Sequence, residues 1–272
     1  MALQTLFTSS TTQVVLDPGD GSYRAGDDFY LGSGAELVTE TDAIVSSGGW
    51  HKLHILGMVS AFYADAIDLQ SVTTVEVLVG ESGSVSSFFD QAVDVWASEA
   101  MVLVNAGMIS ATESNGINMY ASDVAANIQL VNSGTISVNT ALPSSAAVSL
   151  SPGDGFSRVV NSGTITSSGH GVLVGGAFEP SGAIRIYVEN TGVISSAGYG
   201  VFSSSGAMRL DNAGVISGVR AAGANDVINN SGSVTDDVWL GEGADMFRGF
   251  GGTVEGVIYG EEGDDTIWVD QS

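Results

Sequence analysis

The sequence has no cysteine, a single lysine and four prolines in 272 residues. Without cysteine, disulfides and thiolate metal sites are excluded. Basic residues are also scarce, with 7 Lys and Arg against 31 Asp and Glu, so the formal net charge is -24. That charge repels nucleic acid and anionic membrane surfaces and favours metal cations, so nucleic acid is not expected as a partner.

Long apolar runs are missing too. The longest uninterrupted ones, such as "AMVLV" at 100–104, are far shorter than the ~18 residues that a membrane-spanning helix needs. We therefore expect no membrane insertion. The first residues, "MALQTLFTSSTTQVVL", lack the basic start and long apolar stretch of a cleaved signal peptide. Any export is thus expected to proceed without a cleaved N-terminal signal.

Glycine, in contrast, is abundant, and much of it belongs to a repeat. The phrase Asn-x-Gly-x-Ile/Val occurs as "NAGMI" at 105, "NSGTI" at 132 and 161, "NTGVI" at 190, "NAGVI" at 212 and "NSGSV" at 230. Degenerate copies are "ILGMV" at 55, "ESGSV" at 81 and "FGGTV" at 250. Successive copies begin 22 to 29 residues apart up to position 212 and 18 to 20 apart after it. Such a period indicates a solenoid.

Within each repeat the apolar residues alternate with polar ones. Met101 and Leu103 precede Asn105 by four and two positions, and Ile128 and Leu130 precede Asn132 in the same way. This is the period of a strand with one buried face. A second apolar strand, such as "GINMY" at 116–120, follows each phrase. The pattern predicts an all-β, right-handed parallel β-helix with about three short strands per coil.

The repeated asparagine is in phase with the inward residues, so its amide needs hydrogen-bond partners inside the protein. Stacking at one corner would supply them, and the predicted ladder comprises Asn105, Asn132, Asn161, Asn190, Asn212 and Asn230. The glycine two positions later is expected to permit a left-handed backbone at that corner. The alternative is that Asn-x-Gly is only a turn former. Both interpretations make these asparagines structural.

Near the C-terminus the repeat can be divided into nonapeptides, "LGEGADMFR" at 240 and "GEEGDDTIW" at 260. They resemble the Gly-Gly-x-Gly-x-Asp-x-apolar-x repeat of haemolysin-type (RTX) calcium-binding proteins, and the resemblance covers residues 221–268. It implies β-roll coils in which glycine turns and aspartates bind Ca²⁺ through oxygen atoms. The matching positions are Gly241, Gly243, Asp245, Gly260, Gly263 and Asp265, with Asp226 in the weaker "AAGANDVIN" at 221. Leu240 and Glu261 depart from the pattern, and metal-free glycine turns are the alternative.

Three regions follow from this pattern. Residues 1–50 are expected to form an N-terminal β cap or the first coils. Residues 51–220 form the parallel β-helix with coils of 22–29 residues, and 221–272 the RTX-like β-roll with coils of 18–20 residues.

Catalysis is not expected. The arginines are scattered, and the chain has no Gly-x-Ser-x-Gly elbow, phosphate loop or zinc signature. His51 and His54 are three apart, which places them on opposite faces of a strand. A threonine array for ice binding is not favoured either, because Thr-x-Thr occurs as "TIT" at 164 and does not recur from coil to coil. We expect no catalytic residue, and Ca²⁺ as the only cofactor.

Both ends of the sequence are predicted to be strands without a capping helix, in "LQTLFTSSTTQVVL" and "TIWVD". Uncovered strand edges pair with other chains, so we expect head-to-tail assembly into a homo-oligomer or filament. The predicted function is a secreted, calcium-binding structural solenoid in an extracellular filament, surface layer or matrix, with type I-like export. The alternative is a carbohydrate-directed adhesin or polysaccharide-modifying enzyme, with cell-surface or matrix polysaccharide as partner.

Overall fold

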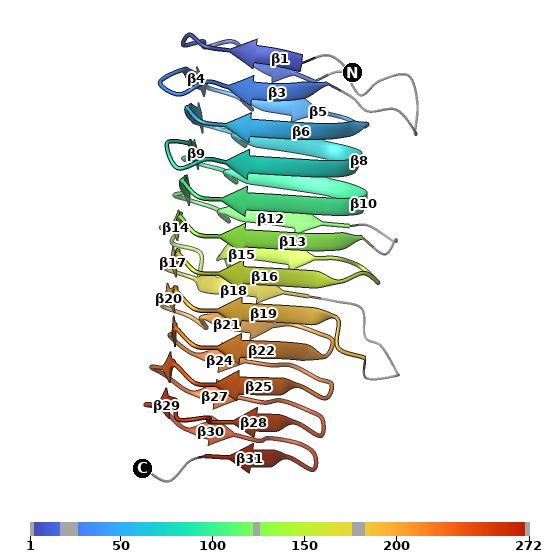
Figure 1. The fold of residues 1–272 in the computed structure, drawn as a ribbon, viewed down its shortest axis with the longest axis vertical. Coiled ribbons are helices and arrows are strands. Elements are labelled where there is room, and N and C mark those ends of the chain that lie inside the picture. The colour runs from blue at the N-terminus through green and yellow to red at the C-terminus, as the bar shows by residue number, and fades with distance from the viewer. Residues whose placement is uncertain (1–2, 17–26, 122–125, 176–182, 270–272) are drawn as a thin grey trace.

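The structure, a computed structural model, describes residues 3–16, 27–121, 126–175 and 183–269. These residues form strands, turns and irregular segments, and none of them lies in a helix. Consequently the described residues contain no helix long and apolar enough to span a membrane. Successive coils stack along one axis, with the first strand at one end and the last strand at the other (Figure 1). The predicted all-β parallel solenoid is confirmed.

Each coil contributes one strand to each of three faces, which we call sheets 1, 2 and 3. Sheet 1 contains β1 (Leu3–Leu6), β3 (Asp28–Leu31), β6 (Trp50–Ile55), the second halves of β8 (Ile67–Val79) and β10 (Val93–Asn105), β13 (Asn127–Asn132), β16 (Ser157–Asn161), β19 (Ile186–Asn190), β22 (Met208–Asn212), β25 (Val227–Asn230), β28 (Met246–Arg248) and β31 (Thr266–Trp268). Every pairing in this series is parallel.

Sheet 2 contains β2 (Val14–Val15), β5 (Ile44–Ser46), the first halves of β8 and β10, β12 (Ile117–Tyr120), β15 (Ala146–Ser151), β18 (His170–Val174), β21 (Val201–Ser203), β24 (Val219–Arg220), β27 (Val238–Trp239) and β30 (Ile258–Tyr259). Sheets 1 and 2 join into one 21-stranded network, because β8 and β10 bend around the corner between them.

Sheet 3 is separate and 10-stranded. It contains β4 (Glu36–Thr39), β7 (Met58–Ala61), β9 (Ser84–Ser87), β11 (Met108–Ala111), β14 (Thr135–Val138), β17 (Thr164–Ser167), β20 (Val193–Ser196), β23 (Val215–Ile216), β26 (Ser233–Val234) and β29 (Thr253–Val254).

The core is a set of stacked apolar columns enclosed by the three sheets. In sheet 3, Val85, Ile109, Ile136, Ile165 and Ile194 lie in register on consecutive strands and are fully buried. Their outward neighbours are half-buried or exposed. The period-2 alternation in the sequence thus sets which side chains enter the core.

The glycine of the repeated phrase has a different role from the one the sequence predicts. None of these glycines has a positive φ, so the expectation of a left-handed backbone is wrong. Instead, a Cβ on Gly134 would lie 2.2 Å from the carbonyl oxygen of Gly107, one coil earlier. Gly107 itself faces the carbonyl oxygen of Gly83 at the same distance. The corner needs glycine because stacked coils leave no room there for a side chain.

The coils shorten towards the C-terminus without losing a face. β24, β26, β27, β29 and β30 have two residues each, yet each still pairs within its own sheet. The narrowing therefore shortens the strands and keeps the coil three-sided. Strand pairing also continues across positions 50 and 220, through β3 with β6 and β22 with β25.

Candidate functional site

Six asparagines form a continuous ladder inside the corner between sheets 1 and 3. In each step, Nδ2 donates a hydrogen bond to Oδ1 of the asparagine one coil further on, at 2.8 to 2.9 Å. All six side chains are buried. The ladder runs through Asn105, Asn132, Asn161, Asn190, Asn212 and Asn230.

Each ladder amide also bonds to the turns beside it. Nδ2 of Asn132 donates to the carbonyl oxygens of Gly134 and Thr164, both at 3.3 Å. The ladder begins at Asn105, whose Oδ1 is buried without a hydrogen-bond partner, because Val79 holds the same position one coil earlier. The hydrogen-bonding groups within the ladder are used by the fold itself, so its role is structural.

A second buried polar column occupies the C-terminal coils, where Asp226, Asp245 and Asp265 stand immediately before β25, β28 and β31. Asp226 and Asp245 are 1% and 2% exposed. Oδ1 of Asp226 accepts a hydrogen bond from the backbone N–H of Met208 at 2.6 Å. Oδ1 of Asp245 accepts from the N–H of Asp226 at 2.7 Å, and Oδ1 of Asp265 from the N–H of Asp245 at 3.1 Å. The predicted stacking of the three aspartates on one edge is present.

The second carboxylate oxygens of this column lack partners. Oδ2 of Asp226 and Oδ2 of Asp245 are buried and accept no hydrogen bond. Burial raises the pKa of Asp226 to about 8, against the lowering effect of the Met208 N–H and with a further rise from Asp245. Burial likewise raises the pKa of Asp245 to about 6, with Asp265 adding to the rise. At neutral pH Asp226 therefore favours the protonated form, and the charged form of either carboxyl group is favoured by a nearby cation.

The glycines of the nonapeptides shape the turns that hold these aspartates. Gly241, Gly243 and Gly263 have positive φ values of 95°, 151° and 134°, which side chains disfavour. Gly260 has no positive φ, but a Cβ there would lie 2.4 Å from Oδ2 of Asp265. Glu261 adopts φ 69° in place of the second glycine of its motif. These residues bring tightly turned backbone up to the aspartate edge.

The residues of this edge suit a hard cation in chemistry, since carboxylate and carbonyl oxygens are the ligands that Ca²⁺ takes. The Oδ2 atoms of Asp226 and Asp245, which have no hydrogen-bond partner, are the atoms that would coordinate such an ion. The carboxylates do not converge on one point, however. Within the described ranges, the one group of three acidic side chains whose ligand atoms lie within 4.8 Å of one another is elsewhere, at Asp42, Asp65 and Asp68.

That group, which the sequence reasoning missed, lies where the chain enters sheet 2 on consecutive coils. Its members are half-buried. Burial raises the pKa of Asp65 to about 8, and the carboxylates of Asp90, Asp94, Asp68 and Asp42 raise it further. A signal was present in "TDAI" at 41 and "ADAIDL" at 64, where an aspartate precedes the same Ala-Ile pair.

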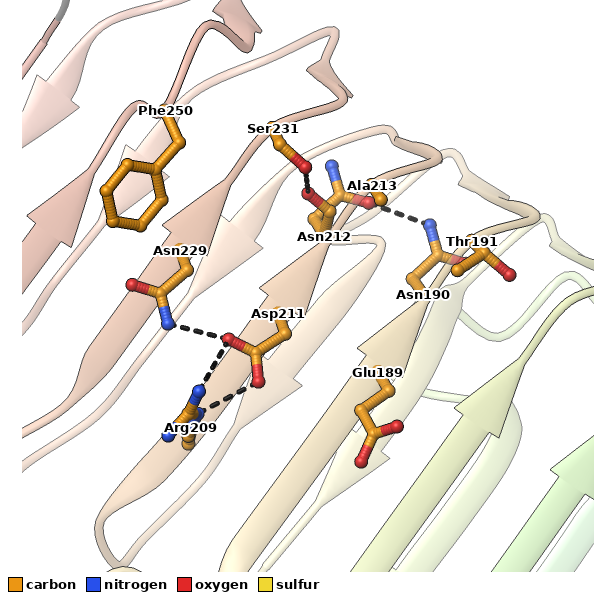
Figure 2. A pocket seen from close by; sticks show the side chains of 10 residues that line it. All are labelled: Glu189, Asn190, Thr191, Arg209, Asp211, Asn212, Ala213, Asn229, Ser231 and Phe250. Carbon is orange, nitrogen blue, oxygen red and sulfur yellow. Dashed lines mark hydrogen bonds and ion pairs between the residues drawn. The ribbon is translucent and has the colours of Figure 1, made fainter.

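A groove of about 400 Å³ crosses β19, β22 and β25 on the outer side of sheet 1 (Figure 2). Arg209 Nε donates to Oδ2 of Asp211 at 2.8 Å, and Asn229 Nδ2 donates to its Oδ1 at 2.6 Å. Phe250 flanks the groove and is exposed. Arg209 and Asp211 form an ion pair within β22, and Asn229 of the next coil bonds to the same carboxylate. Glu189 forms an ion pair with Arg158, one coil earlier. This arrangement is that of a surface ion-pair network.

Fold and buried columns together define a three-sided parallel β-solenoid with an asparagine ladder in its middle and an aspartate edge at its C-terminal end. No protein-family model, curated protein or solved structure matches the chain. Its function is therefore argued from its own geometry.

Proposed function

We propose that this protein is a calcium-binding structural β-solenoid that assembles head to tail into an extracellular filament, surface layer or matrix and has no catalytic role. The support comes from the two ends of the solenoid and from the aspartate edge beside one of them. Export by a type I-like route belongs to the same proposal and rests on the resemblance of residues 221–268 to RTX repeats.

The observation that carries the assembly is an uncovered core at the last described coil. Ile267 stands in register with Phe247 one coil earlier. Phe247 is fully buried, whereas Ile267 is 40% exposed. Trp268 and Val269 beside it are exposed as well. Such a surface is stabilised when another coil packs on it.

A second copy offers a suitable coil at its opposite end. Among the described strands, β1 pairs only with β3, and β31 pairs only with β28, so no other described strand covers their second edges. Both belong to sheet 1, and a head-to-tail translation would set β1 of one copy parallel to β31 of another. Leu3 and Phe7 at the β1 end are exposed apolar residues. The contact is heterologous and does not close, so it propagates into a filament.

Charge opposes this contact, and calcium would offset the opposition. The chain carries a net charge of -24, so copies repel each other at low ionic strength. The last turn adds Glu261, Glu262 and Asp264 on the surface beside Asp265. Neighbouring carboxylates of the column, Asp245 with Asp265 and Asp226 with Asp245, would hold calcium between consecutive turns, together with carbonyl oxygens of the glycine turns. When bound, calcium supplies positive charge and crosslinks consecutive coils.

The test is the assembly state of the full chain with calcium and with a chelator, by electron microscopy and light scattering. We expect filaments in calcium and shorter particles in chelator. The double variant Asp245→Asn/Asp265→Asn should assemble poorly in both, whereas Asp264→Asn, a neighbouring exposed carboxylate, should behave as the parent chain. Monodisperse monomers in both conditions would contradict the assembly. Filaments of equal length in both would remove calcium from the proposal.

A variant at the end separates assembly from metal binding. Trp268→Asp places a charge on the uncovered coil and should prevent filaments. Its calcium affinity, measured by calorimetry, should stay unchanged. Trp50→Asp alters an exposed tryptophan of β6, which is separated from the end strand β1 by β3, and should leave filaments intact. Loss of assembly in both variants would show that the end surface has no special role.

A further inference from the structure

The outer face of sheet 3 carries a row of hydroxyl groups, which appears when the strands of successive coils are aligned by their register. The third residue of each sheet 3 strand from β7 to β20 is a serine or threonine, and the strand register places these residues directly beside one another. These side chains lie on the outer face, where Ser195 is exposed and the others are half-buried. The row comprises Ser60, Ser86, Ser110, Ser137, Thr166 and Ser195.

This face is also free of charge in a strongly charged protein. From β7 through β29, no strand residue of sheet 3 is Asp, Glu, Lys or Arg. Sheet 1, in contrast, carries ion pairs on its outer face, such as Lys52 with Glu76 and Arg158 with Glu189. In a chain of net charge -24, an uncharged face matches a partner that is itself uncharged, because neither side then loses the hydration of an ion.

Exposed aromatic rings stand at one edge of the hydroxyl row. Phe62 directly follows β7, and Phe88 directly follows β9. Their side chains are 43% and 42% exposed, and their ring centroids are 5.2 Å apart with planes 12° from parallel. Tyr63 and Phe89 stand beside them in a second near-parallel pair and are exposed too. An exposed aromatic patch rimmed by polar groups is typical of a binding surface.

The rings and the hydroxyls share one groove. A groove of about 330 Å³ is lined by Phe62 and Phe88 together with Ser60, Ser86 and Ser110. Ser86 Oγ donates to Ser60 Oγ at 3.0 Å, and each hydroxyl keeps further donor or acceptor capacity for a ligand. A sugar ring has the complementary chemistry, with an apolar C–H face that packs on an aromatic ring and hydroxyl groups around its rim.

We infer that this groove binds a neutral polysaccharide whose chain runs along the solenoid axis, with sugar rings packed against the open side of the stacked Phe62–Phe88 pair and with hydroxyl contacts to the serine row. The site goes beyond the proposed structural role, because one subunit contains the whole groove. In an assembled filament the same groove would recur on every subunit along one face.

The experiment incubates the full chain with insoluble cellulose, chitin and mannan, and with alginate as an acidic polysaccharide, and measures the protein that sediments with each. We expect retention on at least one neutral polysaccharide, no retention on alginate, and no weakening by added NaCl. Titration calorimetry with the hexasaccharide of the retained polymer then gives the affinity.

Two variants and a control locate the site. Phe62→Ala/Phe88→Ala should weaken binding about tenfold, which corresponds to ~1.4 kcal/mol. Ser86→Lys keeps both rings but places a charge in the hydroxyl row, and should also reduce binding. Phe156→Ala removes an exposed ring between β15 and β16 and should bind as the parent chain does. Circular dichroism checks that each variant is folded.

Several outcomes would overturn the inference. Retention on none of the neutral polysaccharides would do so, as would unchanged binding by the double variant. A dimer of the parent chain that dissociates in the double variant would identify sheet 3 as a contact between copies instead. Trp268→Asp separates this inference from the proposed assembly, because that variant should lose filaments and keep its polysaccharide binding.

Discussion

Two buried polar columns run along the same solenoid, and they satisfy their hydrogen bonds in opposite ways. In the asparagine ladder each amide donates to the next amide at 2.8 to 2.9 Å. In the aspartate column each Oδ1 accepts from a backbone N–H of the previous coil, and the Oδ2 atoms of Asp226 and Asp245 are left without a partner. An amide has both a donor and an acceptor, whereas a carboxylate only accepts.

The difference shows which coils satisfy their buried polar groups internally and which coils need a proton or a cation from solution. A stack of amides continues indefinitely, because each residue supplies what the next one lacks. A stack of buried carboxylates accumulates negative charge and unfilled acceptors, so each step needs a proton or a cation. We therefore expect the middle of the solenoid to be insensitive to pH and metal ions, and the C-terminal coils to respond to both.

The largest expected effect comes from placing a carboxylate in the amide ladder. Asn161→Asp removes the donors to Asn190 Oδ1 and to the carbonyl oxygen of Val193 and buries an unpaired charge, for a loss of about 3–5 kcal/mol. Chemical unfolding measures it. Asn139→Asp makes the same change at an exposed side chain and should cost no more than ~0.5 kcal/mol. Equal losses in the two variants would contradict the ladder's structural importance.

A smaller effect is expected from the glycines beside the ladder. Gly134→Ala forces a Cβ against the carbonyl oxygen of Gly107, which should cost about 1–3 kcal/mol in thermal or chemical unfolding. Gly34→Ala is the comparison, because Gly34 has φ 78° but no atom within 4 Å of its Cβ position. We expect the first variant to be the less stable. The reverse order would mean that backbone conformation outweighs the close approach of coils.

A further expected effect is a fall in Tm as pH rises. The pKa of Asp226 is about 8 in the folded chain and near 3.8 ordinarily, so between these values the folded state binds a proton that the unfolded state has lost. Stability therefore falls as pH rises from about 4 to about 8. Asp226→Asn should flatten that fall when Tm is measured across this range in chelator.

The flattening should be partial, because burial also raises the pKa of Asp65 to about 8. Asp65→Asn should flatten the fall further, with the raised pKa of Asp245 maintaining part of it. Neither variant should change Tm at pH 4. Calcium should raise the Tm of the parent chain more at pH 8 than at pH 6, since the ion competes with the proton on Asp226. A calcium effect that is equal at both pH values would separate Asp226 from any metal site.

Much of the fold could be predicted from local pattern. The alternation around Met101 and Leu103 assigns the inward residues of a strand correctly, because side-chain direction in a strand depends only on neighbours along the chain. The same phase marks Asn132 as an inward residue, and a buried amide needs partners. The Asp245 to Asp265 spacing likewise placed the two carboxylates on one edge.

The predictions that failed or were missed concern contacts between coils. The phrase "ESGSV" at 81 sets Glu81 in the asparagine position, but the structure aligns Val79 with Asn105. Two extra residues in that turn cause the shift. The acidic group around Asp65 and the hydroxyl row through Ser86 were missed for the same reason.

The sequence by itself determined the repeat, the parallel β-solenoid class and the side chains that enter the core, because these depend on a period of two along each strand and a repeated phrase along the chain. Only the tertiary structure decided which outward residues of different coils lie side by side. Coil length varies from turn to turn, so equal spacing in the chain does not mean equal height in the stack. The register of strand pairing determines which residues of neighbouring coils are adjacent. It places the serines of sheet 3 in one row. It also leaves two carboxylate oxygens of the aspartate edge without partners.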